Sequence, residues 1–321
     1  MNKDSHNIPN LPPYTVAIRT LGKGGEKYQR CLDSLMRQTH RPQAINIYLA
    51  EGFDKPEESV GFETIKVVPK GMVAQRALDY EDVSTEWILF SDDDVEFGRE
   101  SVADMFRKLE QNHAQVIAPD IIPHNKLPIL PRVAMAILGS AVPRFLSPKK
   151  GYIVNCTGSY SYNPNAKGGV RESTTNAGAC FLCRKSDFLK INFKDDLWLD
   201  DAPYAIPDDM VMYFKMHLKG LKILTQYSPD IYHLDARTSM SSERDIKNTY
   251  SLARNKYIFY HLYVLPNLSA SKRLISRMFR GYQHLMGFVY TSILRRDNKV
   301  RIALRNGIAD AKNYLITCKH I

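Results

Sequence analysis

The stretch from Trp87 to Phe97 constrains the fold more than any other part of the chain. Its first four residues, Trp87-Ile88-Leu89-Phe90, are apolar, and three carboxylates, Asp92-Asp93-Asp94, follow after a single serine. An uninterrupted apolar run of this length is typical of a strand buried on both faces inside a parallel sheet. Ligands of such sheets bind outside the carboxyl ends of the strands. The sequence therefore predicts a buried strand that delivers three acids to a ligand-binding edge.

The acid triplet itself has two interpretations. If the backbone stays extended, Asp92 and Asp94 point to one side and Asp93 to the other. Two convergent carboxylates suit a hard divalent cation, Mn²⁺ or Mg²⁺, that also holds substrate phosphates. The alternative is a solvated acidic turn that caps the next helix, and the triplet alone does not decide between the two.

Strand and helix patterns alternate along the first 120 residues. We expect strands near residues 15–18, 45–49, 65–68, 87–90 and 115–118, with helices near 26–36, 73–78 and 102–109. After residues 119–175, which are rich in Pro, Gly, Asn and Ser and are expected to form substrate-facing loops, strands return near 178–183, 221–224 and 231–233. This rhythm predicts an α/β fold with a mainly parallel sheet flanked by helices.

A second acidic motif, Pro207-Asp208-Asp209, precedes an amphipathic pattern that stops at Gly220. Proline suits the first position of a helix and glycine its C-terminal end, so a helix is expected from about Asp208. A helix N-terminus favours ionised carboxylates, so simple capping is one interpretation of the pair and catalysis is the other.

The positive charge is concentrated at the end of the chain. The net charge is +10, and residues 231–321 hold 16 Lys and Arg against 5 Asp and Glu, which leaves the first 230 residues close to neutral. A basic amphipathic helix is predicted there, with apolar and basic positions interleaved: Leu274, Ile275, Met278, Phe279 and Lys272, Arg273, Arg277, Arg280. Such a helix fits an anionic membrane surface better than nucleic acid, which we do not expect as a partner.

Cysteine usage indicates a reducing compartment, and the lack of a signal peptide or a long apolar run indicates the cytoplasm. Five cysteines at irregular spacing form no disulfide framework, and the apolar surroundings of Cys180 and Cys183 favour buried thiols over a metal or redox pair. The polar start lacks the apolar region of a signal peptide, and no apolar run reaches 18 residues. We expect a cytoplasmic protein, peripheral at the inner face of the cell membrane through its basic helices.

Four segments agree in type and order with one family. They are Val16–Thr20 with Cys31–Thr39, Lys70-Gly71 with Gln75-Arg76-Ala77, Trp87–Asp94, and Pro207-Asp208-Asp209 before a helix ending at Lys219-Gly220. Over roughly residues 14–260 the chain resembles the family 2 glycosyltransferases, which have a GT-A (nucleotide-diphospho-sugar transferase) fold. It departs in having Asp-Asp where Glu-Asp is commoner. It also lacks the Gln-x-x-Arg-Trp segment and transmembrane helices of processive synthases.

The resemblance implies an inverting, non-processive enzyme of polysaccharide or cell-surface glycan assembly. It would move a sugar from a nucleotide-diphosphate donor to a hydroxyl of a glycan or lipid-linked acceptor, with a divalent metal. The implied metal ligands are Asp94, Asp92 and His233, and the implied catalytic bases are Asp209 and its neighbour Asp208. The implied nucleotide-sugar contacts are Thr20, Glu51, Arg76, Asp92 and Asp93. Trp198 would stack on the acceptor, although core packing suits a tryptophan equally well.

Three segments are expected: a flexible lead (1–13), the transferase domain (14–265) and a basic helical C-terminal extension (266–321). Two other functions stay open. A nucleotidyltransferase of similar fold would use a Gly-rich turn such as Gly22-Lys23-Gly24-Gly25. A non-catalytic sugar- or nucleotide-binding protein is the second alternative.

Overall fold

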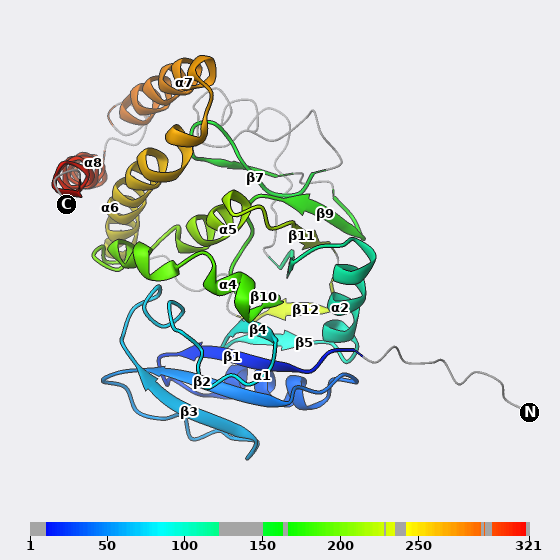
Figure 1. Ribbon diagram of the computed structural model, residues 1–321. Helices are drawn as coiled ribbons and strands as arrows, with labels where there is room; N and C mark the ends of the chain where they lie inside the picture. The colour runs from blue at the N-terminus through cyan, green and yellow to red at the C-terminus, as the bar shows by residue number, and fades with distance from the viewer. Residues whose placement is uncertain are drawn as a thin grey trace, which may run out of the picture.

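The protein is described from a computed structural model that covers residues 11–121, 150–162, 166–227, 229–234, 242–289, 292 and 297–318. Most of the predicted lead and residues 122–149 of the predicted loop region lie outside the described residues. An eight-stranded sheet forms the centre, with helices on both of its faces (Figure 1). The predicted α/β architecture, a mainly parallel sheet flanked by helices, is therefore confirmed.

The sheet has the strand order β3-β2-β1-β4-β10-β6-β11-β9. In that order the strands are Glu63–Val68, Ala44–Ala50, Tyr14–Thr20, Trp87–Asp92, Cys180–Arg184, Val116–Pro119, Ile223–Gln226 and Val170–Ser173. Only β10 and β9 run antiparallel to their neighbours. Two short antiparallel pairs stand apart: β5 (Val95–Phe97) with β12 (Ile231–His233), and β7 (Ile153–Val154) with β8 (Tyr160–Ser161).

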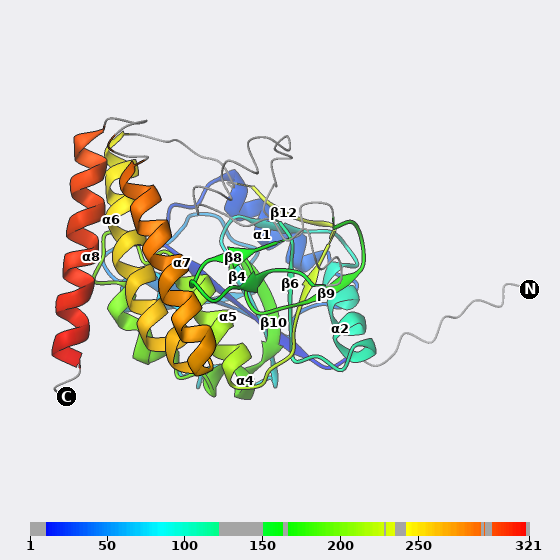
Figure 2. The same ribbon diagram turned by 90° about the horizontal axis from the view of Figure 1, so that it is seen from above.

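The helices of the sheet layers are α1 (Glu26–Met36), α2 (Ser101–Gln111), α4 (Lys185–Leu189), α5 (Asp208–Leu218) and the 3-10 helix η1 (Phe193–Leu199). The C-terminal part contains α6 (Ser242–Phe259), α7 (Ala270–Val289) and α8 (Asn298–Cys318), with η2 (Tyr260–Val264) and η3 (Leu265–Asn267) between α6 and α7. The three long helices lie together at one side of the molecule (Figure 2). None of the described helices is long and apolar enough to cross a bilayer.

Alternation along the buried strands creates two hydrophobic cores. In β1, Val16 and Ile18 join the core beneath α1 and α2, whereas Ala17 belongs to the core that contains η1, α5 and α6. Successive side chains of a strand point to opposite faces, so a central strand needs apolar residues at every position. Residues 87–91 of β4 are all buried, as the apolar run predicts.

The same alternation separates the two cysteines of β10. Cys180 lies in the α1 and α2 core and Cys183 in the other, and burial raises the pKa of both thiols. Two thiols on opposite faces of one sheet cannot hold the same ion. The interpretation as buried structural thiols is confirmed.

The prediction of a helix near residues 73–78 is wrong. The chain makes a single turn there, closed by hydrogen bonds from the Gln75 amide to the Gly71 carbonyl and from the Ala77 amide to Val73. The carboxylate of Asp200 accepts the backbone N–H groups of Val73 and Ala74 at 3.1 and 2.9 Å. A short apolar cluster fits one turn as well as a helix, and here a distant side chain fixes the turn.

Candidate functional site

The site begins where β1 and β4 end side by side. Arg19 is the register partner of Asp92, so the two side chains reach the carboxyl edge of the sheet together. Arg19 Nε donates to Asp92 Oδ1 at 2.6 Å, and Arg19 Nη1 donates to the Met72 carbonyl at 2.9 Å and reaches Asp208 Oδ2 at 3.5 Å. Arg19 thus links the acid triplet, the 71–77 turn and the start of α5.

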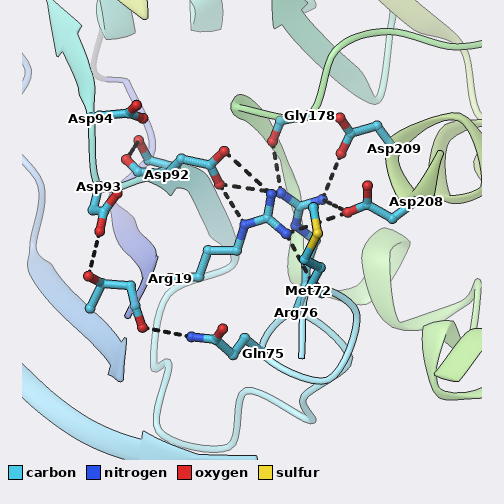
Figure 3. Close-up of polar contacts among 12 residues, drawn as sticks. Arg19, Met72, Gln75, Arg76, Asp92, Asp93, Asp94, Gly178, Asp208 and Asp209 are labelled. Carbon is cyan, nitrogen blue, oxygen red and sulfur yellow. Dashed lines mark hydrogen bonds and ion pairs between the residues drawn. The ribbon is translucent and has the colours of Figure 1, made fainter. Parts of the chain in front are cut away.

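Arg76 makes a second link across the same edge (Figure 3). It is only 3% exposed, and its Nη1 donates to Asp209 Oδ1 at 3.0 Å while Nη2 donates to the Gly178 carbonyl at 2.8 Å. Its guanidinium also lies 3.6 Å from both Asp92 and Asp208. The close-up shows both guanidinium groups between Asp92 on one side and the Asp208-Asp209 pair on the other. Two acidic motifs more than a hundred residues apart in sequence therefore form one cluster.

The cluster shifts the proton affinity of its members. Burial, followed by the charge of Asp209, raises the pKa of Asp208 to about 6, although Arg19 and Arg76 oppose the shift. Burial also disfavours the charged form of Arg19, but the carboxylates of Asp92 and Asp208 outweigh it and raise its pKa. Removing charges from water is expensive unless they are paired, which explains why two arginines accompany three acids here.

The acid triplet does not stay extended. The strand β4 ends at Asp92, and Asp93 and Asp94 form the turn into β5. The expectation that Asp92 and Asp94 converge from an extended strand is therefore wrong, because each acid of the triplet turns to a different partner. Asp93 accepts a hydrogen bond from the Thr20 hydroxyl, and burial raises the Asp93 pKa despite that bond. Thr20 and Asp93, both predicted at the site, are in contact.

Asp94 pairs with His233, the histidine predicted to complete a metal site. The antiparallel pairing of β5 with β12 sets His233 opposite Val95, and His233 Nε2 lies 3.1 Å from Asp94 Oδ1. A carboxylate oxygen and an imidazole nitrogen at this spacing are a suitable two-donor set for a divalent cation. No cluster of three or more His, Cys, Asp or Glu side chains with metal-binding geometry occurs among the described residues. Asp92 is not part of the pair, since Arg19 and Arg76 hold it.

The acids at the start of α5 differ in accessibility. Pro207 occupies the N-cap position of α5, so neither acid is the N-cap residue, and both carboxylates lie within ion-pair distance of Arg76. The Asp208 side chain is 4% exposed, whereas that of Asp209 is 32% exposed. Asp209 packs directly against Gly178, where an added Cβ would lie 1.8 Å from its Oδ1. Asp209 is the acid of this pair that a solvent-borne substrate can reach.

Two predicted contacts, Arg76 and Trp198, lie differently from expectation, whereas a third, Glu51, does not. Arg76 is buried under the acid cluster rather than open to a nucleotide. The Trp198 indole is 5% exposed, packs near Tyr314 and donates its Nε1–H to Asp196, so it is a core residue and offers no open face to an acceptor. Glu51 directly follows β2 and is exposed at the same edge of the sheet, where its position is compatible with the predicted role.

Sequence reasoning missed three organising residues: Arg19, Gln75 and Asp200. Gln75 Nε2 donates to the carbonyls of Thr20 at 2.9 Å and Tyr48 at 3.0 Å, so one amide joins the ends of β1 and β2 to the 71–77 turn. Arg19 and Gln75 belong to segments that resemble the family, but the resemblance assigned no role to either residue. Their partners are 53 to 189 residues away for Arg19 and up to 55 for Gln75, beyond the reach of local pattern reading.

Comparison with known proteins adds a distant structural likeness. No family model matches the sequence, and no curated protein matches it. Among solved structures, the chain is similar to that of GalNAc-T7 with UDP, GalNAc and Mn²⁺, at 14% sequence identity and a TM-score of 0.48. The match covers 89% of this chain and 58% of that one, so the chain spans little more than half the length of the structure it matches.

Proposed function

We propose that the protein is a metal-dependent glycosyltransferase of the GT-A type that uses a nucleotide-diphosphate sugar. The observation that carries the proposal is the meeting of Asp92, from the first acidic motif, with the Asp208-Asp209 pair around Arg76, at the carboxyl edge of a mainly parallel sheet. That edge is where α/β sheets bind their ligands. A transferase of this kind needs both a place for a charged diphosphate and a base for a hydroxyl, and the edge offers acids suited to each.

On the donor side, Asp94 and His233 would hold the cation, with the diphosphate oxygens completing its coordination. Bound there, a divalent ion neutralises the charge of the leaving diphosphate. Thr20 and Asp93 then lie on the nucleotide side of the site, and Glu51 follows at the end of β2. Asp92 has a different part in this arrangement: it anchors both guanidinium groups and so fixes the edge on which the donor rests.

On the acceptor side, Asp209 is the proposed base. It is the more exposed acid of its pair, and the 3.0 Å contact with Arg76 fixes the orientation of its carboxylate. A carboxylate within hydrogen-bond reach can accept the hydroxyl proton as the acceptor oxygen attacks the anomeric carbon. Single-step attack of this kind inverts that carbon, in agreement with the family 2 resemblance. A glycan or a lipid-linked glycan is the proposed acceptor class.

The test is nucleotide release from a panel of UDP-, GDP- and dTDP-sugars with Mn²⁺, in the presence of candidate acceptors. We expect one donor to be cleaved, and Asp209→Asn to lower the rate by about 10²- to 10⁴-fold, the usual contribution of a general base. The matched control is Asp195→Asn, since that side chain is 60% exposed. It should leave the rate within about twofold, as for other exposed surface positions.

Three results would count against the proposal. Unchanged turnover in Asp209→Asn with intact donor binding would remove Asp209 as the base. Release of pyrophosphate from a nucleoside triphosphate and a sugar phosphate, with no cleavage of any nucleotide sugar, would identify a nucleotidyltransferase instead. Binding of a nucleotide sugar without turnover would point to the non-catalytic alternative.

A further inference from the structure

The helix α7 contacts the rest of the protein through polar side chains. Ser276 is fully buried, donates to the Cys156 carbonyl at 2.6 Å and therefore accepts the 2.7 Å hydrogen bond from the Tyr260 hydroxyl. One turn later, Arg280 Nη1 donates to the Thr157 carbonyl at 2.9 Å, and its guanidinium stacks 4.2 Å from the Tyr260 ring. The inward face of α7 is thus held by hydrogen bonds and a cation–π contact.

The outward face of α7 is apolar. Its exposed large residues recur at spacings of one, three and four, as one stripe of a helix does: Leu274 (65% exposed), Ile275 (49%), Met278 (69%), Phe279 (56%), Tyr282 (39%), Leu285 (59%) and Phe288 (54%). An ordinary surface helix turns its apolar stripe to the core and its polar face to water. In α7 the arrangement is inverted. A contiguous exposed patch of this kind marks an interaction surface.

Charge identifies the kind of surface that would cover this stripe. Lys272 and Arg277 are exposed, and helical spacing puts them on opposite edges of the apolar stripe. Residues 266–321 as a whole hold 11 Lys and Arg against 2 Asp and no Glu. Lysine is depleted from the cores of protein–protein interfaces, whereas apolar stripes bordered by Lys and Arg are typical of helices that lie in the headgroup layer of anionic bilayers.

We infer that the outward face of α7 is a docking surface for an anionic lipid bilayer, with its apolar stripe inserted at the boundary between headgroups and acyl chains. The helix would lie in the plane of the membrane, consistent with the finding that no described helix can cross one. The inference stands on α7 alone and does not depend on the proposed transferase activity. Lipid binding is measured without any turnover, so failure of either proposal leaves the other intact.

The experiment is co-sedimentation of the full chain with vesicles of phosphatidylcholine alone or mixed with phosphatidylglycerol. Wild-type protein should partition onto the anionic vesicles at least about tenfold more strongly than onto neutral ones. Leu274→Gln/Met278→Gln should weaken that partitioning by about tenfold or more, because both side chains belong to the stripe. The matched control, Ile302→Gln/Ile316→Gln, changes two equally exposed apolar residues of α8 (54% and 59%) and should bind within about twofold of wild type.

A charge variant separates the two contributions. Lys272→Gln/Arg277→Gln keeps the stripe, so its preference for anionic over neutral vesicles should shrink several-fold while its binding to neutral vesicles persists. Equal binding of wild type to both vesicle types, or wild-type binding by the Leu274→Gln/Met278→Gln variant, overturns the inference. A wild-type dimer in solution that the same variant converts to a monomer also overturns it, since a second copy would then cover the face.

Discussion

Two groups of acids in the site are held in different ways. Asp92, Asp208 and Asp209 are held by Arg19 and Arg76, whereas Asp94 is paired with His233. A permanent guanidinium beside a carboxylate fixes the position of that carboxylate and favours its charged form, although burial still raises the pKa of Asp208. An imidazole beside a carboxylate leaves a pair that a divalent ion can enter, because a neutral imidazole is itself a metal ligand. In the proposed function, the acids paired with arginine hold the sheet edge in place, and the acid paired with histidine binds the donor through a metal. Asp209 belongs to both kinds, since it is paired with Arg76 and is also the proposed base.

The most severe way to break the first group is to remove Arg76. In Arg76→Met, three carboxylates lose a buried cation, and breaking a buried pair costs about 3–5 kcal/mol. We therefore expect the free energy of unfolding, measured in urea, to fall by that amount. Arg107→Met is the control, since its ion pair with Glu100 joins side chains that are 41% and 60% exposed. Its effect should stay below about 1 kcal/mol. Equal effects of the two changes would show that the buried cluster adds no special stability.

The pH dependence of Asp208→Asn sharpens the comparison within the first group. The folded pKa of Asp208 is about 6, above the ordinary 3.8, so its protonated form adds stability below about pH 4. That contribution is lost as the pH rises through 6. Asparagine cannot ionise, so from pH 4 to pH 7 the unfolding free energy should move in favour of the variant, by at most about 3 kcal/mol. Thermal unfolding of both proteins across this range gives the difference. A constant difference would mean that folding does not shift the pKa of Asp208.

The smallest expected effect belongs to the second group. In His233→Gln the cation would lose its nitrogen donor but keep Asp94, so the Mn²⁺ concentration needed for half-maximal nucleotide release should rise by about 10- to 100-fold. Stability should change little, because the His233 side chain is already 25% exposed. His217→Gln, an exposed position near the end of α5, is the control and should leave the Mn²⁺ dependence unchanged. An unaltered Mn²⁺ requirement in His233→Gln would make the pair structural.

The sequence predicted the parts of the site that depend on strand periodicity and helix ends. The apolar run of β4 and the start of α5 at Asp208 lie as expected, because burial on both faces and proline placement leave local signatures. The family resemblance implied Asp94 and His233 as two ligands of one metal, and their side chains are in contact in the structure.

The rest of the site depends on partners that no local pattern contains. The turn at Asp93 and Asp94 separates the triplet because Thr20 and His233 offer distant partners. The burial of Arg76 follows from a cluster assembled from four segments of the chain. A tryptophan such as Trp198 suits a sugar-stacking surface and a hydrophobic core equally well. Only the packing of the C-terminal helices around Trp198 shows that it is a core residue.

Gly178 gives the site a dependence on a residue that has no functional group. The antiparallel direction of β10 brings the segment just before it to the edge where the parallel strands end. The Gly178 carbonyl can therefore hold Arg76, and its missing side chain makes room for Asp209. Even an alanine there would push on the proposed base. In a mutational screen, Gly178 would score like a catalytic residue while taking part in no chemical step.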